Sequence, residues 1–298
     1  MKKRLIVIAV IILALFAGYK IFIRPGGKTS GQSEASREKD IKDLEQKVLS
    51  FNIDGRTAKG VKQWHLEGDS AEIMDDEVHF NDLKAVAYGD NVTINLKSDT
   101  GIYRKEKGEV ELKGNVKVVS DDGVVLTTES AKWSQVTKEI STEEDVRIEQ
   151  GKMIATGKGG HANSDEMKAM LKKDVTVTIE PDTKVWCDGP LNVNYAKNIA
   201  IFYNNVKVKD KDGELFSDKL SVDFDPTTKK IAQVTAEGNV KLRKGKSYTI
   251  SQKAIYREST KSAKLIGKPR VIIDPQELEK AVQSEEYELP GQTSRKEN

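Results

Sequence analysis

Gly238-Asn239-Val240-Lys241-Leu242 is one copy of a short phrase that returns at intervals along the chain. The other copies are Gly89-Asp90-Asn91-Val92-Thr93-Ile94, Gly114-Asn115-Val116-Lys117-Val118, Glu144-Asp145-Val146-Arg147-Ile148, Lys173-Asp174-Val175-Thr176-Val177, Asn204-Asn205-Val206-Lys207-Val208 and a degenerate Gly267-Lys268-Pro269-Arg270-Val271. From Val92 to Val240, successive valines lie 24, 30, 29, 31 and 34 residues apart. Self-similarity at a period of about 20 to 50 residues is typical of repeat architectures, in which each unit buries its apolar face by stacking on its neighbours. The phrase therefore predicts a stack of similar units.

A second phrase lies between copies of the first. Its copies are Ser98-Asp99-Thr100-Gly101-Ile102-Tyr103, Thr128-Glu129-Ser130-Ala131-Lys132-Trp133, Ser217-Asp218-Lys219-Leu220-Ser221-Val222 and Ser251-Gln252-Lys253-Ala254-Ile255-Tyr256. Each repeat thus carries two short segments rich in Val, Ile, Thr and aromatic residues. Turn formers such as Ser120-Asp121-Asp122-Gly123 separate these segments.

Apolar and polar residues alternate strictly within the segments. Val116 and Val118 share one parity, whereas Lys113, Asn115 and Lys117 take the other. A period of two predicts strands with one dry and one wet face.

The expected fold is all-β: an antiparallel β-jellyroll or rolled two-sheet repeat of about a dozen or more strands. Either two facing sheets or one rolled sheet would hide the dry faces. With strands about 4.8 Å apart and split across two sheets, the molecule would be roughly 30 Å long. A parallel β-helix is the competing geometry, although its coils are usually more uniform in length.

The overall charge excludes one class of partner. The 298 residues include 49 Lys and Arg against 47 Asp and Glu, and aromatic residues make up 6% of the chain. No basic field and no interleaved basic and aromatic platform are present, so the sequence predicts no nucleic-acid partner.

The N-terminus predicts a single transmembrane helix. Residues 5–23 are apolar apart from Gly18, Tyr19 and Lys20, and these 19 residues approach the roughly 20 that span a bilayer. The basic Met1-Lys2-Lys3-Arg4 would stay in the cytoplasm, so the remainder would be exported. The rival interpretation is a cleaved signal peptide, but a site after Ala17 would place Leu15 where a small residue is wanted.

No constellation of residues predicts catalysis, a metal or a cofactor. His65, His79 and His161 are scattered, without the spacing of paired metal ligands. Asp75-Asp76-Glu77 lacks the ligand loop of a calcium site, and Gly157-Lys158 lacks the remainder of a phosphate-binding loop. Cys187 is alone, so no disulfide framework is expected and a buried position is its expected role. The chain is not predicted to be an enzyme.

The β region resembles the LptC family, the single-span periplasmic proteins of the lipopolysaccharide-export machinery. The strongest likeness lies in Gly60-Val61-Lys62-Gln63-Trp64-His65-Leu66-Glu67-Gly68-Asp69-Ser70-Ala71, which is similar to that family's opening strand. Leu112-Lys113-Gly114-Asn115-Val116 and Asp122-Gly123-Val124-Val125-Leu126-Thr127-Thr128 are similar to its central strands, and Ile154-Ala155-Thr156-Gly157-Lys158-Gly159 to its penultimate turn. The resemblance covers about Val48 to Ile179.

Beyond that point the chain resembles LptA, the soluble bridge component of the same pathway, which has an OstA-type domain. Ala236-Glu237-Gly238-Asn239-Val240 and Leu265-Ile266-Gly267-Lys268-Pro269-Arg270-Val271 carry this likeness. The expected organisation is a membrane anchor over 1–23, a flexible tether over 24–46, an LptC-like β-jellyroll over 47–180, an LptA/OstA-like β extension over 181–275 and a disordered tail over 276–298.

The resemblance implies a conduit for lipopolysaccharide, with lipid A acyl chains in an apolar lumen. It implies as partners the inner-membrane ABC transporter complex of the LptB, LptF and LptG type, an LptA-type bridge protein paired at a strand edge, and the inner membrane through residues 5–23. The bulk of the chain would then lie in the periplasm. The expected lumen residues are Val78, Phe80, Val92, Ile94, Val110, Leu112, Val116, Val118, Leu126, Val146, Ile148, Val175, Val177, Phe202, Val206, Val208, Phe224 and Val240, and the expected partner edge is Val271, Ile272 and Ile273.

Three alternatives stay open at this point. The inward residues could form a closed core, since the sequence does not separate a core from a lumen. The chain could be a membrane-tethered scaffold that assembles through strand edges without carrying lipid. A polysaccharide-processing β-helix enzyme ranks last, because it would need clustered carboxylates on one face.

Overall fold

The computed structural model describes residues 46–56, 60–88, 93–134, 136–163 and 165–276, which form one sheet of 17 strands. The strands are β1 (Gln46–Arg56), β2 (Lys62–Ile73), β3 (Glu77–Tyr88), β4 (Thr93–Arg104), β5 (Glu109–Ser120), β6 (Val124–Ser134), β7 (Glu139–Gln150), β8 (Met153–Asn163), β9 (Lys168–Ile179), β10 (Thr183–Cys187), β11 (Leu191–Asn194), β12 (Ile199–Lys209), β13 (Glu214–Phe224), β14 (Ile231–Lys244), β15 (Ser247–Arg257), β16 (Ser262–Ile266) and β17 (Arg270–Ile272).

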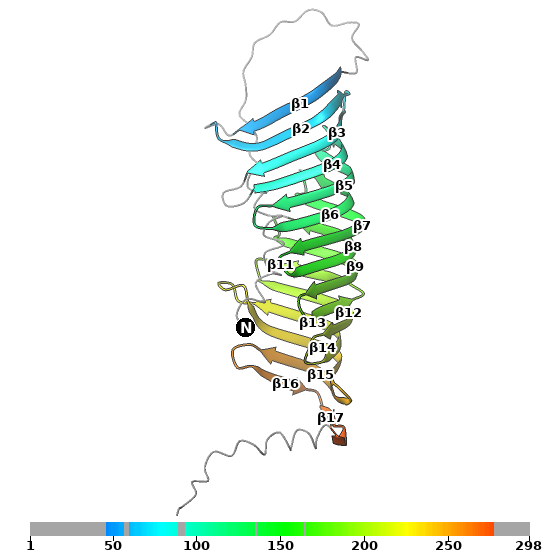
Figure 1. Cartoon of the computed structure of the whole chain (residues 1–298), viewed down its shortest axis with the longest axis vertical. Helices are drawn as coiled ribbons and strands as arrows, with labels where there is room; N and C mark the ends of the chain where they lie inside the picture. Colours follow the sequence, from blue (N-terminus) through cyan, green and yellow to red (C-terminus); the bar gives the residue numbers. More distant parts are fainter. Residues whose placement is uncertain (1–45, 57–59, 89–92, 135, 164, 277–298) are drawn as a thin grey trace, which may run out of the picture.

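The strands form a single antiparallel meander, stacked in order along the molecule (Figure 1). Each of β1 to β8 pairs with its successor. The short β10 and β11 together bridge β9 and β12, and β16 and β17 together cover the far edge of β15. Because every one of these pairings is antiparallel, the all-β antiparallel prediction is confirmed and the parallel β-helix is excluded.

The molecule is longer than the sequence predicted. The meander has fifteen levels, and strands about 4.8 Å apart give a length of about 70 Å, so the expected 30 Å is wrong. That length assumed the first of the two predicted arrangements, with the strands divided between two facing sheets. Instead, single strands of 11 to 14 residues bend at their middle, and one rolled sheet, consistent with a jellyroll, supplies both walls.

The repeated phrase forms these bends. Gly114 and Asn115 have φ angles of 77° and 48°, and Gly238 and Asn239 have 76° and 48°. In β5 these two residues lie opposite one residue of β6, since Lys113 pairs with Ser130 and the next pair is Val116 with Thr128. Such a β-bulge bends the strand and increases its twist, and its left-handed backbone favours Gly and Asn. The phrase is therefore a mid-strand corner.

A large apolar residue pairs with a small residue of the following strand at each corner. The pairs are Phe51–Gly68, Leu83–Ser98, Val116–Thr128, Val146–Gly157, Val175–Cys187, Val206–Ser217 and Val240–Ser251. The large members are only 0–7% exposed. Alternating large and small residues lets the bent layers interdigitate without voids. Cys187 is the small member of its pair and is buried, as predicted.

The first copy of the phrase lies outside the described residues. This copy, Gly89 to Val92, comes between β3 and β4 in the chain, so the lumen role of Val92 stays a prediction. The corner of β3 is Asp82, with φ 47°, followed by the buried Leu83. From Leu83 to Val116 the interval is 33 residues, which restores a regular period.

The predicted anchor, and nearly all of the predicted tether and tail, also lie outside the described residues. Within the part of the chain that the structure describes, no helix has the length and hydrophobicity needed to span a membrane.

Candidate functional site

Two rows of inward side chains run along the sheet, one on each side of the corners. The first, called the Leu126 row, is Ile53, Leu66, Ala85, Leu96, Val118, Leu126, Ile148, Ala155, Val177, Val185, Val208, Leu215 and Leu242. Each member is the direct cross-strand partner of the next. The row is apolar throughout, and it continues to Thr249 of β15 and Val271 of β17.

The second row lines the facing wall. In the C-terminal part, the Leu171 row consists of Thr142, Gly160, Leu171, Leu191, Phe202, Leu220, Ala236, Ala254 and Leu265. Val48, Ala71, Phe80, Gly101, Leu112 and Ala131 form a corresponding row in the N-terminal part. Together the rows make an apolar trough from one edge strand to the other.

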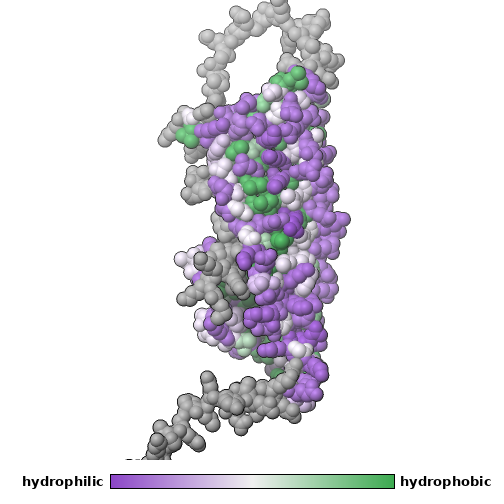
Figure 2. All heavy atoms as spheres, viewed as in Figure 1, coloured by the Kyte–Doolittle hydropathy of each residue, from purple (hydrophilic) through white to green (hydrophobic). Residues whose placement is uncertain are grey.

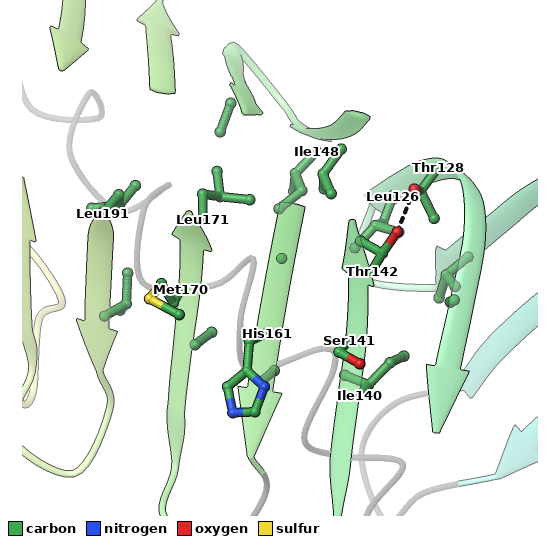
Figure 3. Close-up of a pocket in the computed structure, with 18 of the residues that line it drawn as sticks. Leu126, Thr128, Ile140, Ser141, Thr142, Ile148, His161, Met170, Leu171 and Leu191 are labelled. Atoms are coloured by element: carbon green, nitrogen blue, oxygen red, sulfur yellow. Dashed lines mark hydrogen bonds between the residues drawn. The ribbon is translucent and has the colours of Figure 1, made fainter. Parts of the chain in front are cut away.

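The upper cavity of the trough is narrow. It has a volume of about 120 Å³ and lies between both rows from β4 to β12. Figure 3 shows Leu126, Ile148, Leu171 and Leu191 among the residues that line it. Eight predicted lumen residues line this cavity: Leu112, Val116, Val118, Leu126, Val146, Ile148, Val177 and Phe202.

A few polar groups interrupt this apolar lining (Figure 3). The hydroxyls of Thr128 and Thr142 lie 3.4 Å apart and can share a hydrogen bond. His161, between Ser141 and Met170 in the pairing, has its Nε2 3.7 Å from a Glu139 carboxylate oxygen. These groups find partners within the protein, so the remainder of the surface is suited to hydrocarbon.

The lower cavity is wider, with a volume of about 720 Å³, and lies between β9 and β17. Val185, Val208 and Leu215 of the Leu126 row line it together with Leu220 of the Leu171 row. Charged residues, among them Asp210, Lys211, Asp212, Arg243 and Lys244, line its remainder. Of the predicted lumen residues, Val208 and Phe202 line this second cavity.

The other predicted lumen residues lie outside the two cavities. Val175, Val206, Phe224 and Val240 are buried in the main apolar core. Val78, Phe80 and Val110 pack half-buried against a second core near the N-terminal end, and Ile94 is half-buried on β4. The corner valines Val175, Val206 and Val240 thus fill the bend, whereas the corner valines Val116 and Val146 also line the upper cavity.

Sequence reasoning missed several lining residues that pattern alone could have found. Leu191 and Val193, and Met153 and Ala155, alternate in the same way as the residues that were chosen. The polar lining residues Ser141, Thr142 and His161 carried no such signal, because strand register alone brings them to the cavity.

The outer face is charged and wet. Figure 2 shows a broken band of hydrophobic residues along a surface that is otherwise largely hydrophilic. Arg104 donates hydrogen bonds to Glu77 at 3.1 Å and Glu111 at 2.9 Å, and hydrogen bonds from Lys113 and Arg104 lower the pKa of Glu111.

In the interior, burial raises the pKa of the Cys187 thiol, which keeps it neutral. Across the described ranges, no group of His, Cys, Asp or Glu side chains could hold a metal ion.

Both edge strands expose apolar residues. On the predicted partner edge, Val271, Ile272 and Ile273 are 62%, 38% and 51% exposed. At the opposite end, Val48, Leu49 and Ile53 of β1 are 40%, 73% and 46% exposed, and the sequence had not singled them out. Among the described strands, β1 pairs with β2 alone and β17 with β15 alone. Such edges are templates for pairing with another chain.

Two protein-family models match this chain. The model of the LptC family, described as lipopolysaccharide-assembly, LptC-related, matches residues 6–180, more than half of the chain. The chain belongs to the LptC family. A second model, described as LptA/(LptD N-terminal domain) LPS transport protein, matches residues 190–288 of this LptC-family chain. No curated protein matches it.

Both matches confirm the predicted resemblances and assign the LptC-family chain a role in lipopolysaccharide transport through a β-jellyroll. LptC proteins are components of lipopolysaccharide export that face the periplasm, and proteins of this pathway form a transport bridge.

Proposed function

We propose that this LptC-family chain is a membrane-anchored conduit. In this role it binds the acyl chains of lipid A between the two rows and passes them from the inner-membrane transporter to the next β-jellyroll. The supporting observation is the Leu126 row, an unbroken line of apolar side chains from Ile53 to Leu242 with charged residues on the opposite face. Each methylene exposed to water costs about 0.8 kcal/mol, so a multi-chain lipid needs such a dry path.

The walls must separate to admit an acyl chain. A cavity of 120 Å³ is smaller than the roughly 300 to 1,000 Å³ of common ligand pockets. However, backbone pairing within the described residues joins each strand only to neighbours along the meander. The walls meet through side chains on their open side, so they can part there without breaking a strand ladder.

The LptC-like and LptA-like parts share one sheet. Val175 and Val177 of β9 pair with Cys187 and Val185 of β10, and Leu171 of β9 pairs with Leu191 of β11. The edge of β9 is therefore covered within the chain. We infer that lipid crosses from residues 47–180 to residues 181–275 without an intermolecular junction, and that a separate LptA-type bridge docks on the edge formed by β16 and β17.

The other end of the trough faces the membrane in this scheme. The apolar run over residues 5–23 would anchor the chain in the inner membrane, with the β-jellyroll in the periplasm. The exposed Val48 and Leu49 on β1 would pair with the transporter complex of the LptB, LptF and LptG type.

A photo-crosslinking amino acid tests the conduit. Placed at Val116 or Leu126, which line the upper cavity, it is expected to capture lipopolysaccharide in cells. Placed at Lys113 or Lys117, which are exposed on the opposite face, it is expected to give no lipid adduct. The readout is a gel shift detected with an antibody to lipopolysaccharide. Equal labelling at both pairs of positions would contradict the proposal.

Proline in β17 tests the partner edge. Consecutive backbone N–H groups of a strand point to opposite sides, so Val271→Pro and Ile272→Pro together probe both sides of β17. One of the two variants is expected to reduce co-purification of the LptA-type bridge by about tenfold, since it removes a donor from the free side. Val271→Thr keeps the N–H group and serves as the control. Unchanged co-purification of both proline variants would reject this edge.

A tethered scaffold is the second candidate, favoured by the exposed apolar residues on β1 and β17. It would produce oligomers that depend on these edges, together with no lipid adduct at Val116 or Leu126.

A further inference from the structure

One residue lies between the two cavities. Within the described chain, Phe202 is the residue that lines both the upper and the lower cavity. It is 1% exposed and belongs to the largest fully buried side chains. Its ring therefore fills the space through which the cavities would otherwise connect.

Its place in the Leu171 row explains this position. Phe202 on β12 pairs with Leu191 on β11 and with Leu220 on β13. Leu191 lines the upper cavity and Leu220 the lower one. Beyond Leu220 the row continues with Ala236 and Ala254, which belong to the buried core. The change from 120 to 720 Å³ thus occurs at Phe202.

This position coincides with the change of family along the chain. The LptC model ends at residue 180 and the LptA/LptD model begins at residue 190. β12, which carries Phe202, is the first full-length strand after that change. An aromatic side chain has only two χ angles and a rigid ring. The ring therefore either fills the space between the two cavities or leaves it open.

We propose that the ring of Phe202 divides the trough into two acyl-chain compartments and sets the rate at which hydrocarbon passes between them. This inference rests on the proposed conduit. For a lipid tail to advance from the LptC-like to the LptA-like part, the ring must rotate out of the gap. In the resting state the filled gap keeps the upper compartment closed off from the wider, partly charged lower one, which favours retention of the tail until the ring moves.

The test follows a lipid through both compartments. A photo-crosslinking residue is placed at Leu126 for the upper compartment or at Leu215 for the lower one, both in the Leu126 row. Each is combined with Phe202→Ala or Phe202→Leu in the full chain, which is reconstituted with the transporter in vesicles containing lipopolysaccharide. Illumination at successive times after ATP addition gives the two adduct yields.

Smaller side chains at position 202 should let lipid reach the lower compartment sooner. The early ratio of Leu215 to Leu126 adduct is expected to rise by about threefold or more in Phe202→Ala, and by less in Phe202→Leu. Phe224→Ala, also a truncation of a buried phenylalanine but one that lines neither cavity, is expected to leave the ratio near that of the parent.

Three outcomes decide the proposal. An unchanged ratio in both Phe202 variants, or an equal rise in Phe224→Ala, overturns it. If Phe202→Ala does not give the circular dichroism of the parent, Phe202→Leu, which keeps most of the volume, carries the decision. Adducts at neither Leu126 nor Leu215 in any protein would instead contradict the conduit itself.

Discussion

Gly238→Ala is expected to destabilise the protein by about 3 to 4 kcal/mol, which is among the largest losses for a single methyl group. Gly238 has φ 76°, and a Cβ atom there would overlap the Asp218 carboxylate. The left-handed backbone alone costs a non-glycine residue about 1 to 2 kcal/mol. Displacing Asp218 also breaks its 2.9 Å hydrogen bond from Asn239 Nδ2. Urea denaturation followed by circular dichroism measures the loss.

A matched glycine separates the two causes. Gly123 has φ 89° but no atom within 4 Å of its would-be Cβ, so Gly123→Ala is expected to cost only about 1 kcal/mol. Adding Asp218→Ala to Gly238→Ala should recover part of the larger loss, because it removes the overlapping carboxylate. Similar losses for the two single variants would show that the corner is not closely packed.

Leu126→Glu is expected to reduce the rate of lipopolysaccharide transfer by tenfold or more. This reduction corresponds to an activation free energy that is about 1.4 kcal/mol or more higher. Leu126 lies between Val118 and Ile148 in the Leu126 row, where hydrocarbon would pass. A carboxylate there keeps water, and a passing acyl chain must displace that water or avoid the group. Transfer of lipopolysaccharide from transporter-containing vesicles to soluble LptA-type acceptor provides the measurement.

The neighbouring residue offers the control. Thr127 points to the outer face and pairs with Lys117 and Arg147, so a carboxylate at this position gains favourable charges. Thr127→Glu is expected to retain parental transfer and stability. Loss of transfer in both variants, or in neither, would contradict a lipid path along the Leu126 row.

The alternation of residues allowed much of the trough to be predicted. The alternation predicts that Leu112, Val116, Val118 and Leu126 point inward, and all four line the upper cavity. Parity tells which side chains point inward, but it does not tell whether facing walls touch. The sequence therefore predicts a lumen position for Val240 and Val175 as well, although the structure buries both in the core at the corners.

The structural role of the repeated phrase could not be predicted from its residues alone. Whether Gly114-Asn115 ends a strand or bends it depends on the strand beside it, where Asp99 accepts a 2.8 Å hydrogen bond from Asn115 Nδ2. That partner is distant in the sequence. For the same reason the corner at Asp82-Leu83, which has a different apolar residue and lies outside the repeated phrase, could not be predicted.

The same corner, in which a bulky residue pairs with a small one, recurs in each unit. The length of the molecule therefore depends on the number of units. Each two-strand unit of about 30 residues contacts only the units before and after it and adds about 10 Å to the length. Gaining or losing one unit would change the length of the trough by about 10 Å while preserving both edge strands. The number of hairpins can thus set the length of the trough without altering the chemistry of either end.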